Sequence, residues 1–283
     1  MSSVTGEGFD TFLGELNAAV AACEARETTG LFRLWIERVF TIHGFGTVVS
    51  GIPSRGEVRL GDRLHVGGMS QAGRVRRMQV YGRDAEVARA GECVAINLAD
   101  VDHADLARGQ VLYAGDAREP VSMFEAELSA LGHLPDEISD YTEAHVHIGT
   151  AEVMANLAML AGRPLAPGLT EMVQVRLKSP LTVSPGERFV VRASMAGLAG
   201  GGVTTIGGGR VLGVSNKRLR RNRPWTLDAL ARRHAAIDAP FAWCALHLYE
   251  AGRSLSAAEL ARSAEMPLGQ VEAALAALRA EDV

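Results

Sequence analysis

The sequence predicts a mainly β protein, in which two consecutive small β-barrels are followed by a short α-helical segment. Residues 30–215 consist of short β-branched and apolar runs, separated by Gly, Pro and Asp at even intervals, which favours small barrels. After Pro224 the apolar residues recur with a period of 3.6, which is typical of helices. The 31 glycines and the 5% aromatic content suit a chain with many turns.

Composition limits the class of protein. A chain of 283 residues with 47% hydrophobic and 22% charged residues has room for two or three domains. We find no run of eighteen apolar residues and no signal-peptide pattern, so we expect neither a membrane span nor secretion. Cys23, Cys93 and Cys244 are far apart and form no C-x-x-C pair, which indicates a reducing cytoplasm and no structural zinc.

The pattern divides the chain into five segments. Residues 1–29 are predicted to hold a short helix, because Phe9, Phe12, Leu13, Leu16 and Val20 fall at helical spacing. The other four segments are the β units 30–115 and 116–215, a basic linker at 216–226 and a partial winged helix at 227–283.

Three helices are predicted in the last segment. The first, "PFAWCALHLYEAG", closes at Gly252, and the second, "SLSAAELARSA", opens with a capping box from Ser256 to Glu259. The third, "PLGQVEAALAALRAEDV", starts at Pro267. This arrangement resembles the start of a winged-helix domain, with a plain helical cap as the alternative.

The stretch "FTIHGFGTVVSGIPSRG" looks at first like a phosphate-binding loop. Its glycines are Gly44, Gly46 and Gly51, but the third glycine of a G-x-G-x-x-G motif would fall at Val49. No G-x-x-x-x-G-K-[ST] string occurs in the chain, and "TVVSGI" is β-branched. We therefore expect these glycines in turns and bends between strands rather than around a nucleotide.

The net charge of −4 hides a basic region. No Asp or Glu lies between Arg188 and Leu227, and the basic residues there are Arg188, Arg192, Arg210, Lys217, Arg218, Arg220, Arg221 and Arg223. Such a block is a candidate footprint for nucleic-acid phosphates, with a solvated basic linker as the alternative. In "GRVRRMQVYG", Arg74 and Arg76 would share one face of a strand.

The residues offer little catalytic chemistry. The carboxylate pairs Glu125/Glu127 and Asp136/Glu137 have no matching base. His145 and His147 would share a strand face, but no third metal ligand follows by spacing, so a packed or hydrogen-bonded role is favoured. We expect no catalytic residues and no metal site, and the residues favour an RNA-binding module over an enzyme.

Longer motifs carry a resemblance to a known family. The run "LFRLWIERVFTIHGFGTVVSGIPSRGEVRLGDRLHV", with "GRVRRMQVYG" and "AGECVAINLADVDHADLARGQVL", resembles domain II of a translational GTPase, and SelB, the selenocysteine-specific elongation factor, most of all. "HVHIGTAEV", "SPGERFVVR" and "TIGGGRVL" resemble domain III of the same factors. The basic run and helices resemble their linker and first winged helix, and "SSVTGEGFDTFLGEL" resembles the end of their GTPase domain.

The resemblance implies a role in translation elongation. The partners it implies are aminoacyl-tRNA, with selenocysteinyl-tRNA suspected, the ribosome, and an mRNA hairpin bound by later winged helices that would follow Val283. A GTPase domain would precede Met1, and GTP and Mg²⁺ would belong to it. We expect no cofactor in this chain and no GTP hydrolysis by it alone.

The resemblance also implies a pocket for the aminoacyl end of tRNA in domain II. Glu37 and Arg38 stand at the positions of an Asp-Arg pair in the family. Cys93 stands where the family has an Arg after "A-G-[QE]". His43 would lie at the mouth of the pocket. Because a selenol is largely anionic at neutral pH, nearby cations would distinguish selenocysteine from serine by charge. Cys93 supplies no such charge, so either Arg38 or His43 compensates or the specificity differs.

For contacts with the tRNA backbone, resemblance and polarity indicate His147, Thr150 and Arg210 in domain III. Arg74, Arg76 and the basic run Lys217, Arg218, Arg220, Arg221 and Arg223 would add phosphate contacts. The alternative is a winged-helix DNA-binding regulator with a β-barrel body. It is disfavoured because the helix from Pro267 to Ala280 carries one basic residue, Arg279, where a recognition helix usually offers several contacts.

Overall fold

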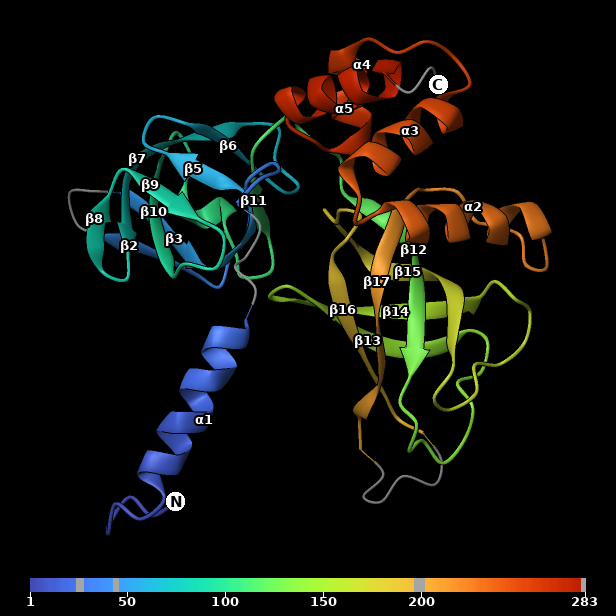
Figure 1. Cartoon of the computed structure of the whole chain (residues 1–283), viewed down its shortest axis with the longest axis horizontal. Helices are drawn as coiled ribbons and strands as arrows, with labels where there is room; N and C mark the ends of the chain where they lie inside the picture. Colours follow the sequence, from blue (N-terminus) through green and yellow to red (C-terminus); the bar gives the residue numbers. More distant parts are fainter. Residues whose placement is uncertain (24–27, 43–45, 196–201, 281–283) are drawn as a thin grey trace.

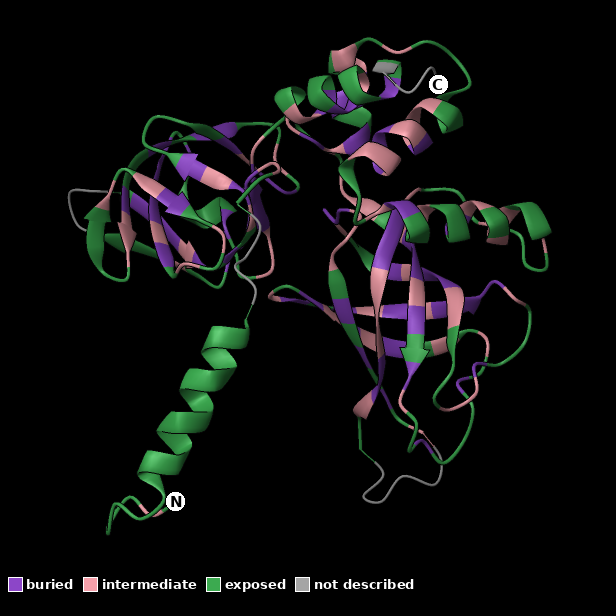
Figure 2. Ribbon diagram, viewed as in Figure 1, coloured by how far each residue is buried: buried purple, intermediate pink, exposed green. Residues whose placement is uncertain are grey.

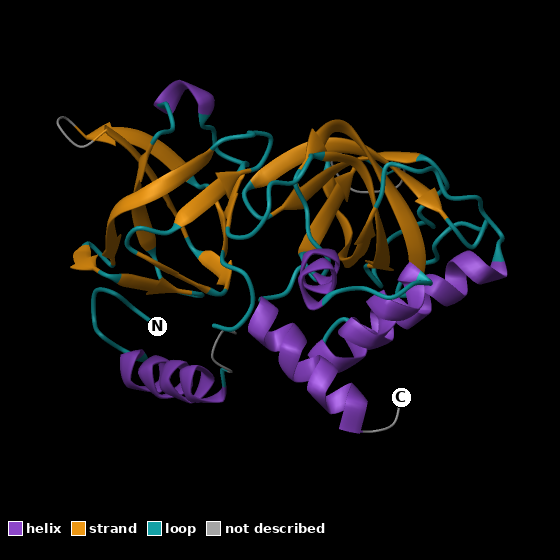
Figure 3. Cartoon of the chain, turned by 90° about the horizontal axis from the view of Figure 1, so that it is seen from above, coloured by secondary structure: helices purple, strands orange, loops and turns teal. Residues whose placement is uncertain are grey.

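The computed structural model describes residues 1–23, 28–42, 46–195 and 202–280. Figure 1 shows the two β units side by side, the C-terminal helices above the second of them, and the N-terminal helix α1 (Phe9–Ala22), which extends away. Figure 3 shows the C-terminal helices along one side of the two β units. The predicted fold class, mainly β with a helical end, is confirmed.

The first β unit is a curved sheet around one apolar core. Nine of its strands form a sheet in the order β2-β3-β10-β7-β6-β11-β1-β4, with β8 paired to β7, while β5 and β9 form a separate pair. Its strands are β1 (Arg33–Trp35), β2 (Arg38–Ile42), β3 (Gly46–Gly51), β4 (Pro53–Arg55), β5 (Glu57–Arg59), β6 (Arg63–Val66), β7 (Ala72–Val80), β8 (Arg83–Ala85), β9 (Val87–Arg89), β10 (Val94–Ala99) and β11 (Val111–Tyr113). Leu34, Val49, Leu64 and Ile96 lie in its core. A 3-10 helix, η1 (His103–Asp105), interrupts the chain before β11.

The glycines of the loop-like stretch serve the backbone, as predicted. Gly46 opens β3 with φ at 83°, a left-handed conformation that other residues rarely adopt. A Cβ on Gly51 would lie 2.5 Å from the carbonyl oxygen of Trp35. Gly44 lies outside the described residues. The chain after these glycines is a strand, so no helix N-terminus faces a phosphate here.

The second β unit is a closed six-stranded barrel in the order β12-β15-β14-β13-β16-β17. Its strands are β12 (Val121–Ala130), β13 (Thr142–Ile148), β14 (Ala151–Met159), β15 (Thr170–Leu181), β16 (Arg188–Ala193) and β17 (Thr204–Val214). All neighbours pair antiparallel, and side chains alternate between the interior and the outside, as in Phe189, Val191 and Ala193 of β16. Closure leaves this unit without edge strands.

The C-terminal helices form a small unit of their own. They are α2 (Pro224–Ala236), α3 (Pro240–Ala251), α4 (Ala257–Ala264) and α5 (Leu268–Ala280). The predicted capping box is present, because the Ser256 hydroxyl accepts from the Glu259 N–H while the Glu259 carboxylate accepts from the Ser256 N–H. Gly252 ends α3 in the left-handed conformation, as predicted. The helix α2 was not predicted and starts inside the range 216–226.

The helix α1 (Phe9–Ala22) has no buried residue, and Figure 2 shows it exposed along its length. By contrast, α2 rests on the closed barrel, where Leu230 packs against Leu160 and Leu212. Among the described residues, no helix combines the length and apolarity that crossing a membrane requires.

Candidate functional site

A hollow of about 610 Å³ opens on the first β unit beside β2. Its size lies within the range of small-ligand sites, roughly 300 to 1,000 Å³. Its walls come from two segments far apart in the sequence. The lining residues are Glu37, Arg38, Val39, Phe40, His103, Leu106, Ala107 and Arg108.

Backbone pairing brings these two segments together. The Ile36 N–H donates to the Gln110 carbonyl at 2.8 Å, and the Gly109 N–H donates to the Ile36 carbonyl at 3.1 Å. This pairing places Arg108 next to Glu37. The loop is held in shape by the Gln110 side chain, which accepts from the Ala107 N–H and donates to the Asp105 carbonyl.

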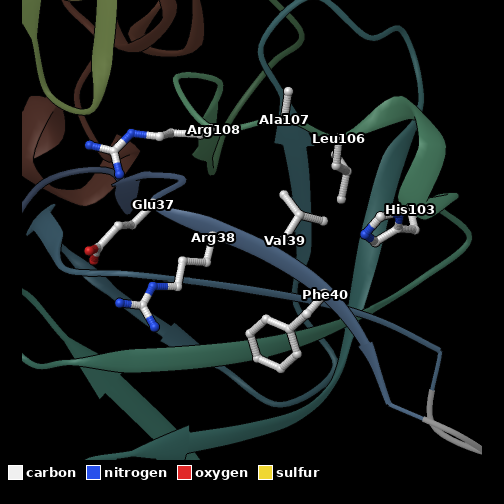
Figure 4. A pocket seen from close by; sticks show the side chains of 8 residues that line it. All are labelled: Glu37, Arg38, Val39, Phe40, His103, Leu106, Ala107 and Arg108. Carbon is white, nitrogen blue, oxygen red and sulfur yellow. The ribbon is translucent and has the colours of Figure 1, made fainter.

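The charged groups of the hollow gather at one end. Figure 4 shows the ends of Glu37, Arg38 and Arg108 on the same side, with Val39, Leu106 and His103 on the other. Among the described residues, none forms an ion pair with Glu37, Arg38 or Arg108. The carboxylate can therefore accept from an ammonium group, while the guanidiniums can donate to a phosphate, carbonyl or anionic side chain.

The other two residues predicted for an aminoacyl pocket, Cys93 and His43, are not among the lining residues that the structure describes. Cys93 is exposed just before β10, where its carbonyl accepts from the Tyr81 N–H, and it is not among the lining residues. His43 lies outside the described residues. The positive charge in the hollow therefore comes from Arg38, which was predicted, and Arg108, which was not.

A second hollow, of about 500 Å³, lies where the two β units meet. Arg108 borders this hollow as well as the first, and His147, Thr150 and Glu152 of the closed barrel form its other side. The Thr150 hydroxyl donates to the Ile36 carbonyl at 2.6 Å, so it joins the two units. His147 Nε2 is buried, and no group in the described part of the chain is its hydrogen-bond partner. The structure thus brings His147 and Thr150 close to the first hollow.

The basic run follows the outside of the closed barrel. The Arg221 guanidinium pairs with Asp140 and lies 5.6 Å from the ring centre of Tyr141. The Asn222 N–H donates to the Leu160 carbonyl, which anchors the linker at the end of β14. Lys217, Arg218 and Arg220 are exposed.

The remaining predicted residues lie apart from both hollows. Arg74 and Arg76 are exposed on β7, where a bulge in the pairing with β10 falls at Arg76. Arg210 is engaged in a two-pronged pair with Asp238, at 2.7 and 2.5 Å. The hydrogen bonds from Arg210 lower the pKa of the Asp238 carboxyl, and those to Asp238 raise the pKa of Arg210. Arg210 therefore also holds the helical unit on the barrel.

Arg108 and His103 are the polar lining residues that were not predicted from the sequence. Both follow β10 and precede β11. The antiparallel pairing of β11 with β1 places Arg108 next to Glu37, and η1, which carries His103, contacts β2 and β3. The order of strands in a sheet cannot be read from composition or periodicity. The one available signal was a cluster of polar residues in the loop "DHADLARGQ".

Family comparisons match both β units. Residues 46–113 match the family model of elongation factor Tu domain 2. Residues 126–218 match that of the β-barrel domain of the selenocysteine-specific elongation factor. These ranges fall within the first β unit and over the closed barrel with the start of the basic linker.

Curated relatives agree with this assignment. The chain is 34% identical over 261 residues to the selenocysteine-specific elongation factor of Desulfomicrobium baculatum, covering 92% of this chain and 40% of that protein. It is 31% identical to the factor of Escherichia coli K12, covering 74% of this chain and 32% of that protein. The chain thus spans less than half the length of these relatives.

A solved structure has the same fold. The apo form of translation elongation factor SelB from Methanococcus maripaludis aligns with a TM-score of 0.63 and 21% identity, covering 76% of this chain and 49% of that one. Together with the two family models and the curated relatives, this identifies the chain as a SelB-like elongation-factor chain.

Proposed function

We propose that this chain is the tRNA-binding part of a translation elongation factor, and that the hollow beside β2 receives the aminoacyl end of tRNA. The observation that carries the proposal is the gathering of Glu37, Arg38 and Arg108, without ion-pair partners among the described residues, in a hollow with an apolar wall. A carboxylate suits the free α-ammonium group of an aminoacyl ester, and the guanidiniums suit the terminal phosphates.

We further propose that the amino acid is selenocysteine, as the names of the relatives suggest. A selenolate needs a cation held close to it. Cys93 lies outside the hollow, and Arg38 and Arg108 line it, so these two arginines are our candidates for that cation. In this proposal the intact factor delivers the charged tRNA to the ribosome at recoded UGA codons, and other parts of it bind GTP, Mg²⁺ and the mRNA hairpin.

The arginines and other polar groups on the closed barrel, including His147, would contact the tRNA backbone. No observation favours the alternative of a DNA-binding regulator. Within the described part of the chain, α5 offers Arg279 as its basic residue, which is little for reading a DNA groove.

Variants of the hollow test the proposal. We expect Arg38→Ala and Arg108→Ala each to weaken binding of selenocysteinyl-tRNA by roughly tenfold or more, because each removes a charge-assisted hydrogen bond. Binding is measured by anisotropy of labelled tRNA. Arg63→Ala is the matched control, since Arg63 is exposed on β6 outside the hollow. Equal affinities for all four proteins would contradict the proposal.

A further inference from the structure

Three exposed aromatic rings lie near one another on the surface, and each has an arginine over it. The chain has 4 tyrosines and 3 tryptophans, and four of these seven are exposed. Three of the exposed rings lie on or beside the basic linker and α2, namely Tyr141 (47% exposed), Trp225 (65%) and Tyr249 (70%). An arginine carbon lies 5.2 to 5.6 Å from each ring centre; the arginines are Arg176 and Arg221 on Tyr141, Arg223 on Trp225 and Arg232 on Tyr249.

These groups form one continuous surface. Arg221 and Arg223 are two residues apart in the linker and reach Tyr141 and Trp225 respectively. Trp225 and Arg232 are seven residues apart in α2, which is about two helical turns, so they share a face. Arg232 then reaches Tyr249 of α3. Figure 2 shows much of α2 exposed on the outside of the molecule.

Several arginines of the surface are free of carboxylate partners in the described part of the chain. Among the described residues, no carboxylate forms an ion pair with Arg218, Arg220, Arg223 or Arg232, whereas Arg221 pairs with Asp140. Guanidiniums in this arrangement remain available to phosphates. Because the rings are about half exposed or more, their contacts with arginine bury little apolar area and do not account for three such rings on one face.

The surface is also separate from the hollow beside β2. The turn between β13 and β14 carries Thr150, which contacts the first β unit, while Tyr141 lies at the other end of β13. β13 has 7 residues, so at about 3.3 Å per residue its ends lie roughly 20 Å apart. The Tyr141 end of the surface therefore lies well away from Thr150 and from the hollow.

We propose that this Arg–aromatic surface binds single-stranded RNA. Unpaired bases stack on Trp225, Tyr249 and Tyr141, and the neighbouring guanidiniums neutralise phosphates or extend the stacking plane. A duplex keeps its bases stacked on one another and presents mainly its backbone, so it uses the arginines and leaves the rings without a partner. The inference does not depend on the function proposed for the hollow.

The test compares stacking with charge. We expect Trp225→Ala/Tyr249→Ala to weaken binding of a fluorescent 12-nucleotide oligouridine by roughly 10- to 100-fold, with an unchanged dependence on salt. Arg218→Ala/Arg220→Ala should instead lower the slope of log K against log salt by about 1.4, or about 0.7 for each phosphate that is no longer neutralised. Tyr81→Ala is the control, since Tyr81 is 68% exposed on the first β unit.

Tryptophan emission gives a second readout. Trp35 and Trp243 are each 6% exposed, so quenching by a stacked base reports on Trp225. Oligouridine should quench the emission of the natural protein and not that of Trp225→Ala. The proposal would be overturned if Trp225→Ala/Tyr249→Ala bound oligouridine as tightly as the natural protein. It would also be overturned if duplex RNA bound as tightly as the single strand, and equally to the natural protein and to the double variant. Arg108→Ala should leave oligouridine binding unchanged, which separates this surface from the hollow.

Discussion

Trp35 is the residue on which the junction of the two β units depends most directly. It belongs to β1 of the first unit, yet its ring packs in the core of the closed barrel. Its indole N–H donates to the Glu187 carboxylate at 2.8 Å, and Arg33 donates to the same carboxylate at 2.7 Å. The Arg33 side chain is almost fully buried, and this pairing with Glu187 and the Thr182 carbonyl satisfies its charge.

Gly149 allows this approach, and its replacement is our prediction at the residue scale. A Cβ at this position would lie 2.1 Å from the Trp35 ring, and φ is 55°. We expect Gly149→Ala to lower the free energy of unfolding by about 3 kcal/mol, because overpacking adds to backbone strain. Denaturant unfolding measures it.

Gly82→Ala is the matched control. Gly82 also has a positive φ, at 77°, but nothing lies within 4 Å of the added methyl group. Gly82→Ala should lower the free energy of unfolding by about 1 kcal/mol, because it adds backbone strain alone. If the two variants were equally stable, the packing of Trp35 against Gly149 would not matter to the junction.

At the scale of elements, the end of α4 joins the helical unit to both β units. Glu265 follows α4 with φ at 56°, and its carboxylate pairs with Arg55 of β4 and with Arg118 of the segment between the β units. Burial opposes ionisation of this carboxyl, but Arg118, with hydrogen bonding from Ser184 and the charge of Arg55, outweighs it, so the pKa of Glu265 is lowered.

We expect Glu265→Gln to destabilise the protein by about 3 kcal/mol near neutral pH, because it leaves two partly buried guanidiniums without their carboxylate. A carboxyl whose folded pKa is lowered stabilises the fold above its unfolded pKa, about 4.3, and loses this effect as pH falls through the folded value. The stability difference between the two proteins should therefore shrink below about pH 4.

Unfolding followed from pH 7 to pH 3 measures this difference. The control is Glu57→Gln, because Glu57 pairs with Arg59 and Arg89 on the surface and should contribute less than about 1 kcal/mol. A difference between Glu265→Gln and the natural protein that stays constant over this range would contradict a role for the ionised carboxylate.

Element types were predictable from the sequence because they depend on local pattern. Three features depend only on residues close together in the sequence: the period of two in the β units, the capping box at Ser256 and the glycine at Gly252 that ends α3. α2 was missed because its sequence is polar and alanine-rich. Its Leu230 is buried in a small cluster with Leu160 and Leu212 of the closed barrel, separate from the barrel core. Tertiary packing decided that helix.

The site was predictable only in part, for the same reason. Glu37 and Arg38 were predicted for an aminoacyl pocket from the resemblance, and both line the hollow beside β2. Arg108 lines the hollow but was not predicted, and Cys93 was predicted for the pocket but does not line the hollow. Both errors arise because the order of the strands in the sheet decides which side chains meet. Resemblance and polarity indicated Thr150 for a contact with the tRNA backbone. Its hydroxyl instead donates to the Ile36 carbonyl, a contact between the two β units that no local sequence pattern encodes.

At the scale of the whole molecule, contacts among the first β unit, the closed barrel and the C-terminal helices fix the position of the hollow relative to the Arg–aromatic surface. Thr150, Glu187 and Glu265 tie the first β unit, the closed barrel and the helices together through hydrogen bonds and ion pairs. The hollow lies on the first β unit, and the Arg–aromatic surface lies on the outside of the closed barrel and on α2 and α3. The fold therefore keeps the two surfaces apart as well as fixed.

The central claim is that the hollow recognises the aminoacyl group itself, and one measurement tests it most directly. The affinity of the chain is measured for the same tRNA with and without its aminoacyl group, in the same salt. We expect the charged tRNA to bind at least tenfold more tightly, because its ammonium group gains the Glu37 carboxylate. Equal affinity for the two forms would contradict the account, since backbone contacts alone would then explain all binding.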